Sequence, residues 1–108
     1  MAGITTHVLD TSRGKPGVGI GVTLEMFDGD DWTPVGRGTT DDDGRLRTLT
    51  DEYEMVDGVY RITFATGEYN PTGFFPEVAI TFEVRDTAQH YHVPLLLSAF
   101  GYTTYRGS

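Results

Sequence analysis

Alternation of apolar and polar side chains is the feature that most constrains the fold of this 108-residue chain. Residues 21–27, 58–65 and 78–85 each place an apolar side chain at nearly every second position, with mostly polar ones between. A period of two predicts strands that bury one face and expose the other. Clusters of Asp, Gly and Pro separate the segments, as in sheets joined by tight turns.

Shorter apolar runs predict the remaining strands. They lie at residues 4–10, 32–38, 45–49, 91–98 and 102–106. Residues 67–76 form an irregular connection with room for one helical turn at most. Seven or eight short strands without a convincing helix indicate an all-β sandwich. No linker or repeat divides the chain, so residues 1–108 are expected to form a single domain.

Charge and composition exclude several classes of partner. Sixteen acidic against eight basic residues give a formal charge of −8, which makes nucleic acids and anionic membranes poor partners. An anionic ligand would need a local cationic pocket. The absence of cysteine excludes disulfides and thiolate metal sites. With no apolar span and no secretory leader visible, the expected location is the cytoplasm.

The three histidines are candidates for chemistry. His90 and His92 share one face of a strand whose other face is apolar, so they point outward. Thr103 and Tyr105 likewise share a face of the last strand. Ordinary surface histidines are the alternative interpretation. A metal interpretation is weaker, because no carboxylate stands at a supporting position, and we expect neither a metal nor a cofactor.

The acidic segment Asp41-Asp42-Asp43-Gly44 is similar to a calcium loop but fails its pattern. With Gly44 in the sixth position, threonines occupy the first and last positions, where Asp and Glu are required. A β-turn is the better account. It would hold Arg45 at the start of a strand, as a fixed guanidinium or as the ion-pair partner of the aspartates.

Several longer motifs resemble one known family. These are His7-Val8-Leu9-Asp10 with Gly14-Lys15-Pro16, Thr40 to Arg45, Phe74-Phe75-Pro76-Glu77, His90 to Ser98, and Gly101 to Ser108. Together they span nearly the whole chain and are similar to the 5-hydroxyisourate hydrolases of the transthyretin family. The closing Tyr-Arg-Gly-Ser is the most specific of them. Transthyretin itself, a hormone carrier, lacks that tetrapeptide and the paired histidines.

The resemblance implies a fold, an assembly and a reaction. The fold is a sandwich of two four-stranded antiparallel sheets, and four copies form a homotetramer, a dimer of dimers, around a channel. The reaction is hydrolysis of 5-hydroxyisourate, the product of urate oxidation, with ring opening. The implied catalytic residues are His7, Arg45, His92 and Ser108, and the implied further substrate contact is Tyr105. Thr103 and His90 are expected to contact the substrate too, because they share strand faces with Tyr105 and His92.

The residue types suit this chemistry. A neutral imidazole can take a proton from an attacking water near pH 7, and an arginine can stabilise the oxyanion. Which histidine is the base stays open at this point. The alternative function is a carrier that binds a small aromatic ligand in the same channel.

Overall fold

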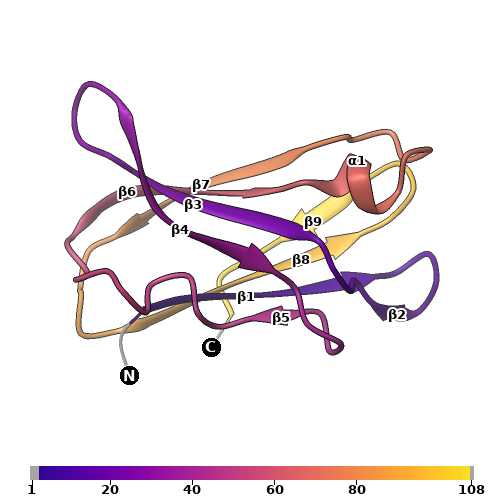
Figure 1. Ribbon diagram of the computed structural model, residues 1–108, viewed down its shortest axis with the longest axis horizontal. Helices are drawn as coiled ribbons and strands as arrows, with labels where there is room; N and C mark the ends of the chain where they lie inside the picture. Colours follow the sequence, from indigo (N-terminus) through magenta and orange to yellow (C-terminus); the bar gives the residue numbers. More distant parts are fainter. Residues whose placement is uncertain (1–2, 108) are drawn as a thin grey trace.

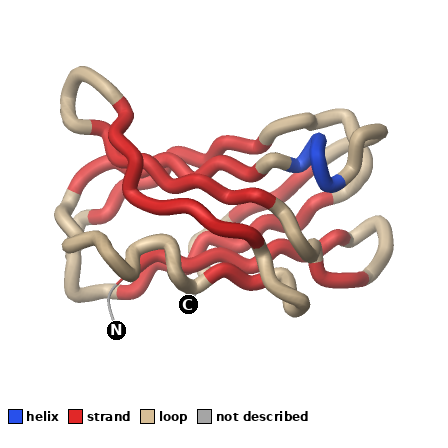
Figure 2. Tube along the Cα trace, in the orientation of Figure 1, coloured by secondary structure: helices blue, strands red, loops and turns tan. Residues whose placement is uncertain are grey.

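Two β-sheets pack face to face in the computed structural model, which describes residues 3–107 (Figure 1). Figure 2 shows the two layers of strands, with the single described helix at one end. The elements are β1 (Gly3–Asp10), β2 (Lys15–Pro16), β3 (Gly21–Phe27), β4 (Trp32–Thr39), β5 (Arg45–Leu46), β6 (Gly58–Phe64), α1 (Thr66–Tyr69), β7 (Val78–Val84), β8 (His90–Leu97) and β9 (Tyr102–Thr104). The predicted all-β sandwich is confirmed.

One sheet follows the expected design. Its strands run in the order β4-β3-β6-β7, and every neighbouring pair is antiparallel. The alternation in the sequence corresponds to its two faces. Val22, Leu24, Tyr60, Ile62 and Phe64 are buried toward the other sheet. The intervening side chains are half-buried or exposed.

The other sheet departs from the expectation of four antiparallel strands. Its order is β2-β1-β8-β9, and a fifth strand, β5, also pairs with β1. The central strands β1 and β8 run parallel, in register from Gly3 opposite His90 to Asp10 opposite Leu97. An antiparallel direction is required only where a short turn joins two strands. Here the whole other sheet lies between β1 and β8 in the chain, so β8 can return in the same direction.

The predicted strand at residues 45–49 is shorter in the structure. β5 ends at Leu46, and backbone hydrogen bonds from Asp51 to Thr48 and from Tyr53 to Thr50 mark successive turns. The turns allow Leu49 to enter the core. Leu49 passes so close to β4 that a Cβ on Gly36 would lie 2.0 Å from its carbonyl oxygen.

The core lies between the sheets and fixes the orientation of β1 and β8. Ile4 and Val8 of β1 and Leu95 of β8 are fully buried. Their neighbours in sequence must therefore face away from the core. Every buried side-chain nitrogen or oxygen within residues 3–107 has a hydrogen-bond partner. The two sheets thus form a rigid support for the outward-facing side chains.

The connection after β6 contains one helical turn, α1, as the sequence allows. Tyr69 ties this turn to β1, because its hydroxyl donates to Oδ2 of the buried Asp10 at 2.7 Å. No helix in the described part of the chain is long and apolar enough to cross a membrane.

Candidate active site

The outer face of β1 and β8 gathers four of the polar side chains that can carry chemistry. The parallel register places Thr5 opposite His92, while His90 lies opposite Gly3 and His7 opposite Pro94. Side chains paired across parallel strands point to the same side of the sheet. Because Ile4, Thr6 and Val8 face the core, Thr5 and His7 face outward together with both histidines of β8. Figure 1 shows β1 and β8 side by side in this layer.

Arg45 joins the same face from β5. This strand pairs antiparallel with β1 and places Arg45 directly opposite His7. The preceding β-turn is present as expected, since the Gly44 N–H donates to the Asp41 carbonyl at 2.9 Å. Gly44 has φ +77°, and a Cβ there would lie 2.4 Å from the Val8 carbonyl oxygen. Only glycine fits this left-handed, crowded position.

The aspartates of the turn hold the backbone of Arg45 and leave its side chain unpaired. Oδ1 of Asp41 accepts the N–H groups of Asp43 and Arg45, each at 2.9 Å. These hydrogen bonds lower the pKa of the Asp41 carboxyl. The ion pairs within residues 3–107 involve Arg13, Arg61 and Arg85. The alternative of an ion pair between Arg45 and the aspartates is therefore not found there.

A cavity of about 400 Å³ lies over this face. Its polar lining includes two arginines, two histidines and three threonines. They are Thr5, Thr6, Arg45, Arg47, Thr50, His90 and His92. Asp51 also borders it. The predicted Arg45, His90 and His92 are thus brought together from two separate parts of the chain, β5 and β8.

Arg47 and Thr5 are lining residues that the sequence analysis missed. Each lies two positions from a residue that was singled out, Arg47 from Arg45 and Thr5 from His7. A period of two could have placed Thr5 beside His7 on one face. The same periodicity does not fix the side of the sheet on which Arg47 lies, because β5 ends before that residue.

Thr5 makes the closest contacts within the cavity. Its Oγ1 lies 2.8 Å from Nε2 of His90 and 2.8 Å from Nδ1 of His92. The two imidazole rings are 6.3 Å apart between centroids, and the hydroxyl bridges them. This contact holds Nδ1 of His92. No residue from 3 to 107 hydrogen-bonds its other ring nitrogen, Nε2.

His92 is the histidine whose protonation the site perturbs. Burial lowers its pKa below the usual 6.5, and the positive charges of His90, Arg45, His7 and Arg47 lower it further. Both effects disfavour the imidazolium form. His92 is therefore neutral at physiological pH and able to accept a proton.

His7 has a different hydrogen-bonding role. Its Nε2 lies 2.9 Å from the carbonyl oxygen of Asp43, in the turn before Arg45. A carbonyl can only accept, so Nε2 of His7 carries a proton and donates it. This bond, together with the β1–β5 pairing, links the orientation of His7 to that of the Arg45 turn.

Thr103 and Tyr105 are not brought into this cavity within one chain. Thr103 lies opposite Leu96, four residues along β8 from His92. Tyr105 follows the end of β9 and lines a separate cleft with Ile80 and Phe82 of β7. Their contact with substrate stays a prediction.

Ser108 lies outside the described residues, so its role also stays a prediction. Its neighbour Gly107 is held beside His92, because the Gly107 N–H donates to the His92 carbonyl at 2.8 Å. A Cβ on Gly107 would lie 2.6 Å from Cδ2 of the His92 ring. Glycine is therefore needed here for space, which gives a structural reason for part of the closing tetrapeptide.

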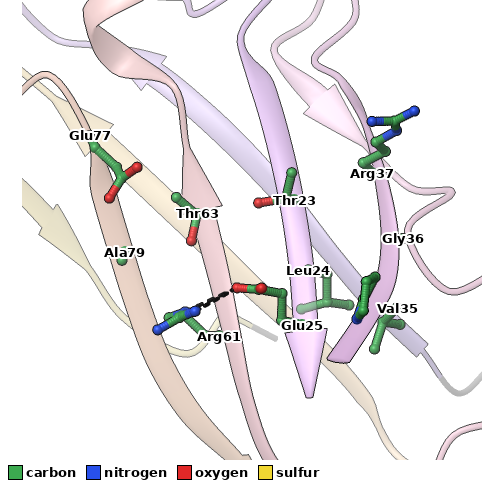
Figure 3. A pocket seen from close by; sticks show the side chains of 11 residues that line it. Thr23, Leu24, Glu25, Val35, Gly36, Arg37, Arg61, Thr63, Glu77 and Ala79 are labelled. Atoms are coloured by element: carbon green, nitrogen blue, oxygen red, sulfur yellow. Dashed lines mark hydrogen bonds and ion pairs between the residues drawn. The ribbon is translucent and has the colours of Figure 1, made fainter. Parts of the chain in front are cut away.

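A larger groove of about 800 Å³ lies on the outer face of the other sheet (Figure 3). Its central arginine, Arg61, is already neutralised. Nη2 of Arg61 lies 2.8 Å from Oε1 of Glu25, and its guanidinium stacks over Trp32 at 4.2 Å from the ring centroid. Arg37 also lines this groove and has no ion pair among residues 3–107, but none of the three histidines, all of which the structure describes, lines it. The smaller cavity combines unpaired arginines with two histidines and is therefore the candidate active site.

No three His, Asp or Glu side chains in the described ranges are grouped so as to hold a metal ion.

The chain matches a known protein family. Residues 4–107 match the model of the HIUase/transthyretin family. A protein of Salmonella dublin, 5-hydroxyisourate hydrolase, is 45% identical over 109 residues, which cover 97% of this chain and 80% of that protein.

Solved structures of two different kinds share the fold. The 5-hydroxyisourate hydrolase of Klebsiella pneumoniae has a TM-score of 0.86 and 30% identity, with 100% of both chains covered. Sea bream transthyretin, in complex with thyroxine, has a TM-score of 0.90 and 30% identity, and the match covers 96% of this chain and 93% of that one. Fold similarity alone therefore does not separate an enzyme from a carrier.

Proposed function

The chain belongs to the HIUase/transthyretin family, and we propose that it hydrolyses 5-hydroxyisourate in urate degradation. The observation that carries the proposal is one cavity in which His92, with a lowered pKa, meets the guanidinium of Arg45. A proton acceptor and a fixed cation are what hydrolytic ring opening requires.

In the proposed reaction, His92 activates the water. Nε2 of His92 removes one proton as the water oxygen bonds to the acyl carbon of the substrate ring. The electron pair of the carbonyl moves to its oxygen, which becomes an oxyanion. When the carbonyl re-forms, the ring C–N bond breaks, and the proton held by His92 passes to the leaving nitrogen. His92 returns to its neutral form, so the cycle needs no oxidant or cofactor.

Arg45 is assigned to the oxyanion. It is permanently charged, half-buried and without an ion-pair partner among residues 3–107. A cation aimed at developing charge in a partly dry site stabilises the transition state more than the ground state. Its planar fork also suits the edge of a urate-like ring. Arg47, at the same cavity, adds positive potential to a protein of net charge −8.

His7 is assigned a positioning role beside Arg45, because its Nε2 proton is committed to the Asp43 carbonyl. The contributions of Ser108 and Tyr105 are proposed from the family resemblance alone, and that of Thr103 from its place beside Tyr105 on the last predicted strand. The structure thus favours His92 over His7 as the base, a choice that the sequence leaves open.

A carrier of small aromatic ligands is the competing function, and sea bream transthyretin in complex with thyroxine shares the fold. Two features favour the hydrolase. The relatives that are 40–45% identical are 5-hydroxyisourate hydrolases and a uric acid degradation protein. The lining of the cavity is also titratable, with His90, His92 and two arginines, whereas an apolar ligand would suit an apolar channel.

We also propose that the protein is a homotetramer, a dimer of dimers. Both sheets end in strands with a free edge, β7 and β9, and a free edge is a template for pairing with another copy. The cleft that contains Ile80, Phe82 and Tyr105 brings these two edges together. Phe74 and Phe100 are 67% and 80% exposed, which is costly for a lone sandwich. Light scattering should give four copies, and a fully active monomer would contradict the assembly.

The function is tested by adding the purified protein to urate and urate oxidase. Ultraviolet absorbance follows the decay of the 5-hydroxyisourate that forms. We expect the decay to accelerate in proportion to protein concentration. A carrier would bind the compound in a stoichiometric amount without accelerating its decay, so an unchanged decay rate would reject the hydrolase.

A further inference from the structure

We infer that Thr5 is a positioning residue that fixes the proton of His92 on Nδ1 and so leaves Nε2 as the acceptor. Its hydroxyl accepts a hydrogen bond from Nδ1–H of His92 and donates its own hydrogen to Nε2 of His90. The effect on catalysis rests on the proposed function. The hydrogen-bond arrangement itself does not.

The geometry makes Thr5 a bridge between the two rings. Its Oγ1 is 2.8 Å from Nε2 of His90 and 2.8 Å from Nδ1 of His92. Both distances are those of good hydrogen bonds. The parallel register places Thr5 directly opposite His92, and the half-buried Thr5 is held by the central strand of the sheet. The bridge is therefore a product of two rigid strands.

A hydroxyl has one hydrogen to donate, so the bridge can couple the two rings. If Thr5 donates to His90, it must accept from His92, and His92 then carries its proton on Nδ1. If Thr5 donates to His92 instead, the proton of His92 lies on Nε2, and this nitrogen becomes a donor. The direction of one hydrogen bond thus decides whether His92 can act as a base.

The charges around the cavity favour the first direction. The groups facing His92 are His90 on its own strand, His7 on β1, Arg45 on β5, and Arg47 and Asp51 beyond β5. Apart from Asp51, these are cationic or potentially cationic. A lone pair on Nε2 is attracted by such a field, whereas an Nε2–H group is repelled by it.

The inference also gives His90 a function. His90 is exposed, but its Nε2 accepts the Thr5 hydrogen and so holds the bridge in one direction. A protonated His90 could no longer accept, and the hydrogen of Thr5 would be free to turn toward His92. His90 therefore acts on the His92 ring through two hydrogen bonds, both made by the Thr5 hydroxyl.

The test compares Thr5→Val, which removes only the hydroxyl, with Thr5→Ser, which restores it. Thr63→Val is the matched control, since Thr63 is also half-buried on the outer face of a central strand, in the other sheet. For Thr5→Val we expect kcat to fall about ten- to a hundredfold, the range seen when the partner that orients a ligating histidine is removed. KM should stay within about twofold, and Thr5→Ser should recover most of kcat.

A second readout needs no activity. Two-bond ¹H–¹⁵N NMR spectra of the labelled protein without substrate report which ring nitrogen of His92 is protonated. We expect Nδ1–H in the wild type and in Thr63→Val, and a mixture of tautomers in Thr5→Val. If Thr5→Val does not fold, the wild-type spectrum alone still tests the inference, because it shows which ring nitrogen of His92 is protonated.

The outcomes separate the inference from the proposed function. An Nε2–H tautomer in the wild type, or a Thr5→Val variant with full kcat, would overturn the role of Thr5. Equal losses in Thr5→Val and Thr5→Ser would do the same. A wild type that shows Nδ1–H but no hydrolysis would leave the Thr5 bridge standing and reject the hydrolase.

Discussion

Arg61 and Arg45 lie on the outer faces of the two sheets and differ in whether an acidic side chain pairs with them. On β6, Arg61 is paired with Glu25 and stacked on Trp32, and its side chain is about one-third exposed, at 32%. On β5, Arg45 is half-buried and has no ion-pair partner within residues 3–107. A paired arginine has its field cancelled locally, whereas an unpaired one projects its field into the cavity. Arg37 of β4 also borders the larger groove without an ion pair among residues 3–107, so the histidines beside Arg45, together with its unpaired charge, indicate which face does chemistry.

The two arginines differ in pairing because their nearby carboxylates are bound differently. On the active face, the Asp41 carboxylate, four residues before Arg45, accepts hydrogen bonds from two backbone N–H groups and is not available to the Arg45 side chain. On the other face, Glu25 and Arg61 are cross-strand partners, and within residues 3–107 Arg61 alone hydrogen-bonds this carboxylate. The same residue types thus make a stabilising ion pair in one sheet and a charged site in the other.

The largest effect should come from removing His92, the proposed base, or His7, which is proposed to position the Arg45 turn. We expect His92→Ala to lower turnover by about 10²-fold or more, as loss of general-base chemistry does, and His7→Ala to lower it by a similar factor through misplacement of Arg45. The double variant should be little worse than the worse single one, because the residues act as a unit. Initial rates of ring opening measure this, with light scattering to verify assembly. Retention of more than about a tenth of wild-type turnover would refute the assignment.

The pH dependence should differ from that of a free histidine. Because burial and nearby positive charge lower the pKa of His92, it stays neutral below pH 6.5. We expect kcat/KM to hold from neutral pH to below that value and then to fall about tenfold per pH unit. A profile already half lost at pH 6.5 or above would show that another group, or an unperturbed histidine, controls the rate.

Arg47→Ala should give a smaller effect that depends on salt. Arg47 is exposed, so its interaction with an anionic substrate is partly screened. We expect kcat/KM to fall about two- to fivefold at low salt, as exposed charge pairs of up to ~1 kcal/mol allow. The difference in kcat/KM between Arg47→Ala and the wild type should become smaller at high salt. A loss that is independent of salt would indicate a direct contact instead.

Much of this architecture could be predicted from the alternation in the sequence. The faces of β3, β6 and β7 follow the period of two, and so do the outward histidines of β8. The parallel pairing of β1 with β8 could not be predicted this way, because periodicity fixes faces and not strand direction. That pairing is what places Thr5 between His90 and His92.

The site itself was only partly predictable. His7, Arg45 and His92 were identified through family motifs, whereas the unpaired state of Arg45 depends on which atoms the Asp41 carboxylate binds. Arg47 lies beyond the short β5, where the period of two no longer determines which way a side chain faces. Thr103, Tyr105 and Ser108 stay predictions, since one chain does not bring the first two to the cavity and the third lies outside the described residues.

The most direct test of the contrast makes the same change on both faces. Arg45→Lys and Arg61→Lys each keep the charge and lose the planar fork. With matched protein concentrations and verified assembly, initial rates of 5-hydroxyisourate decay are compared with the wild type. The account predicts a loss of about 10²-fold or more for Arg45→Lys, as when an oxyanion donor is removed, and a rate within about twofold for Arg61→Lys. Near-normal turnover in Arg45→Lys, or equal losses in the two variants, would contradict it.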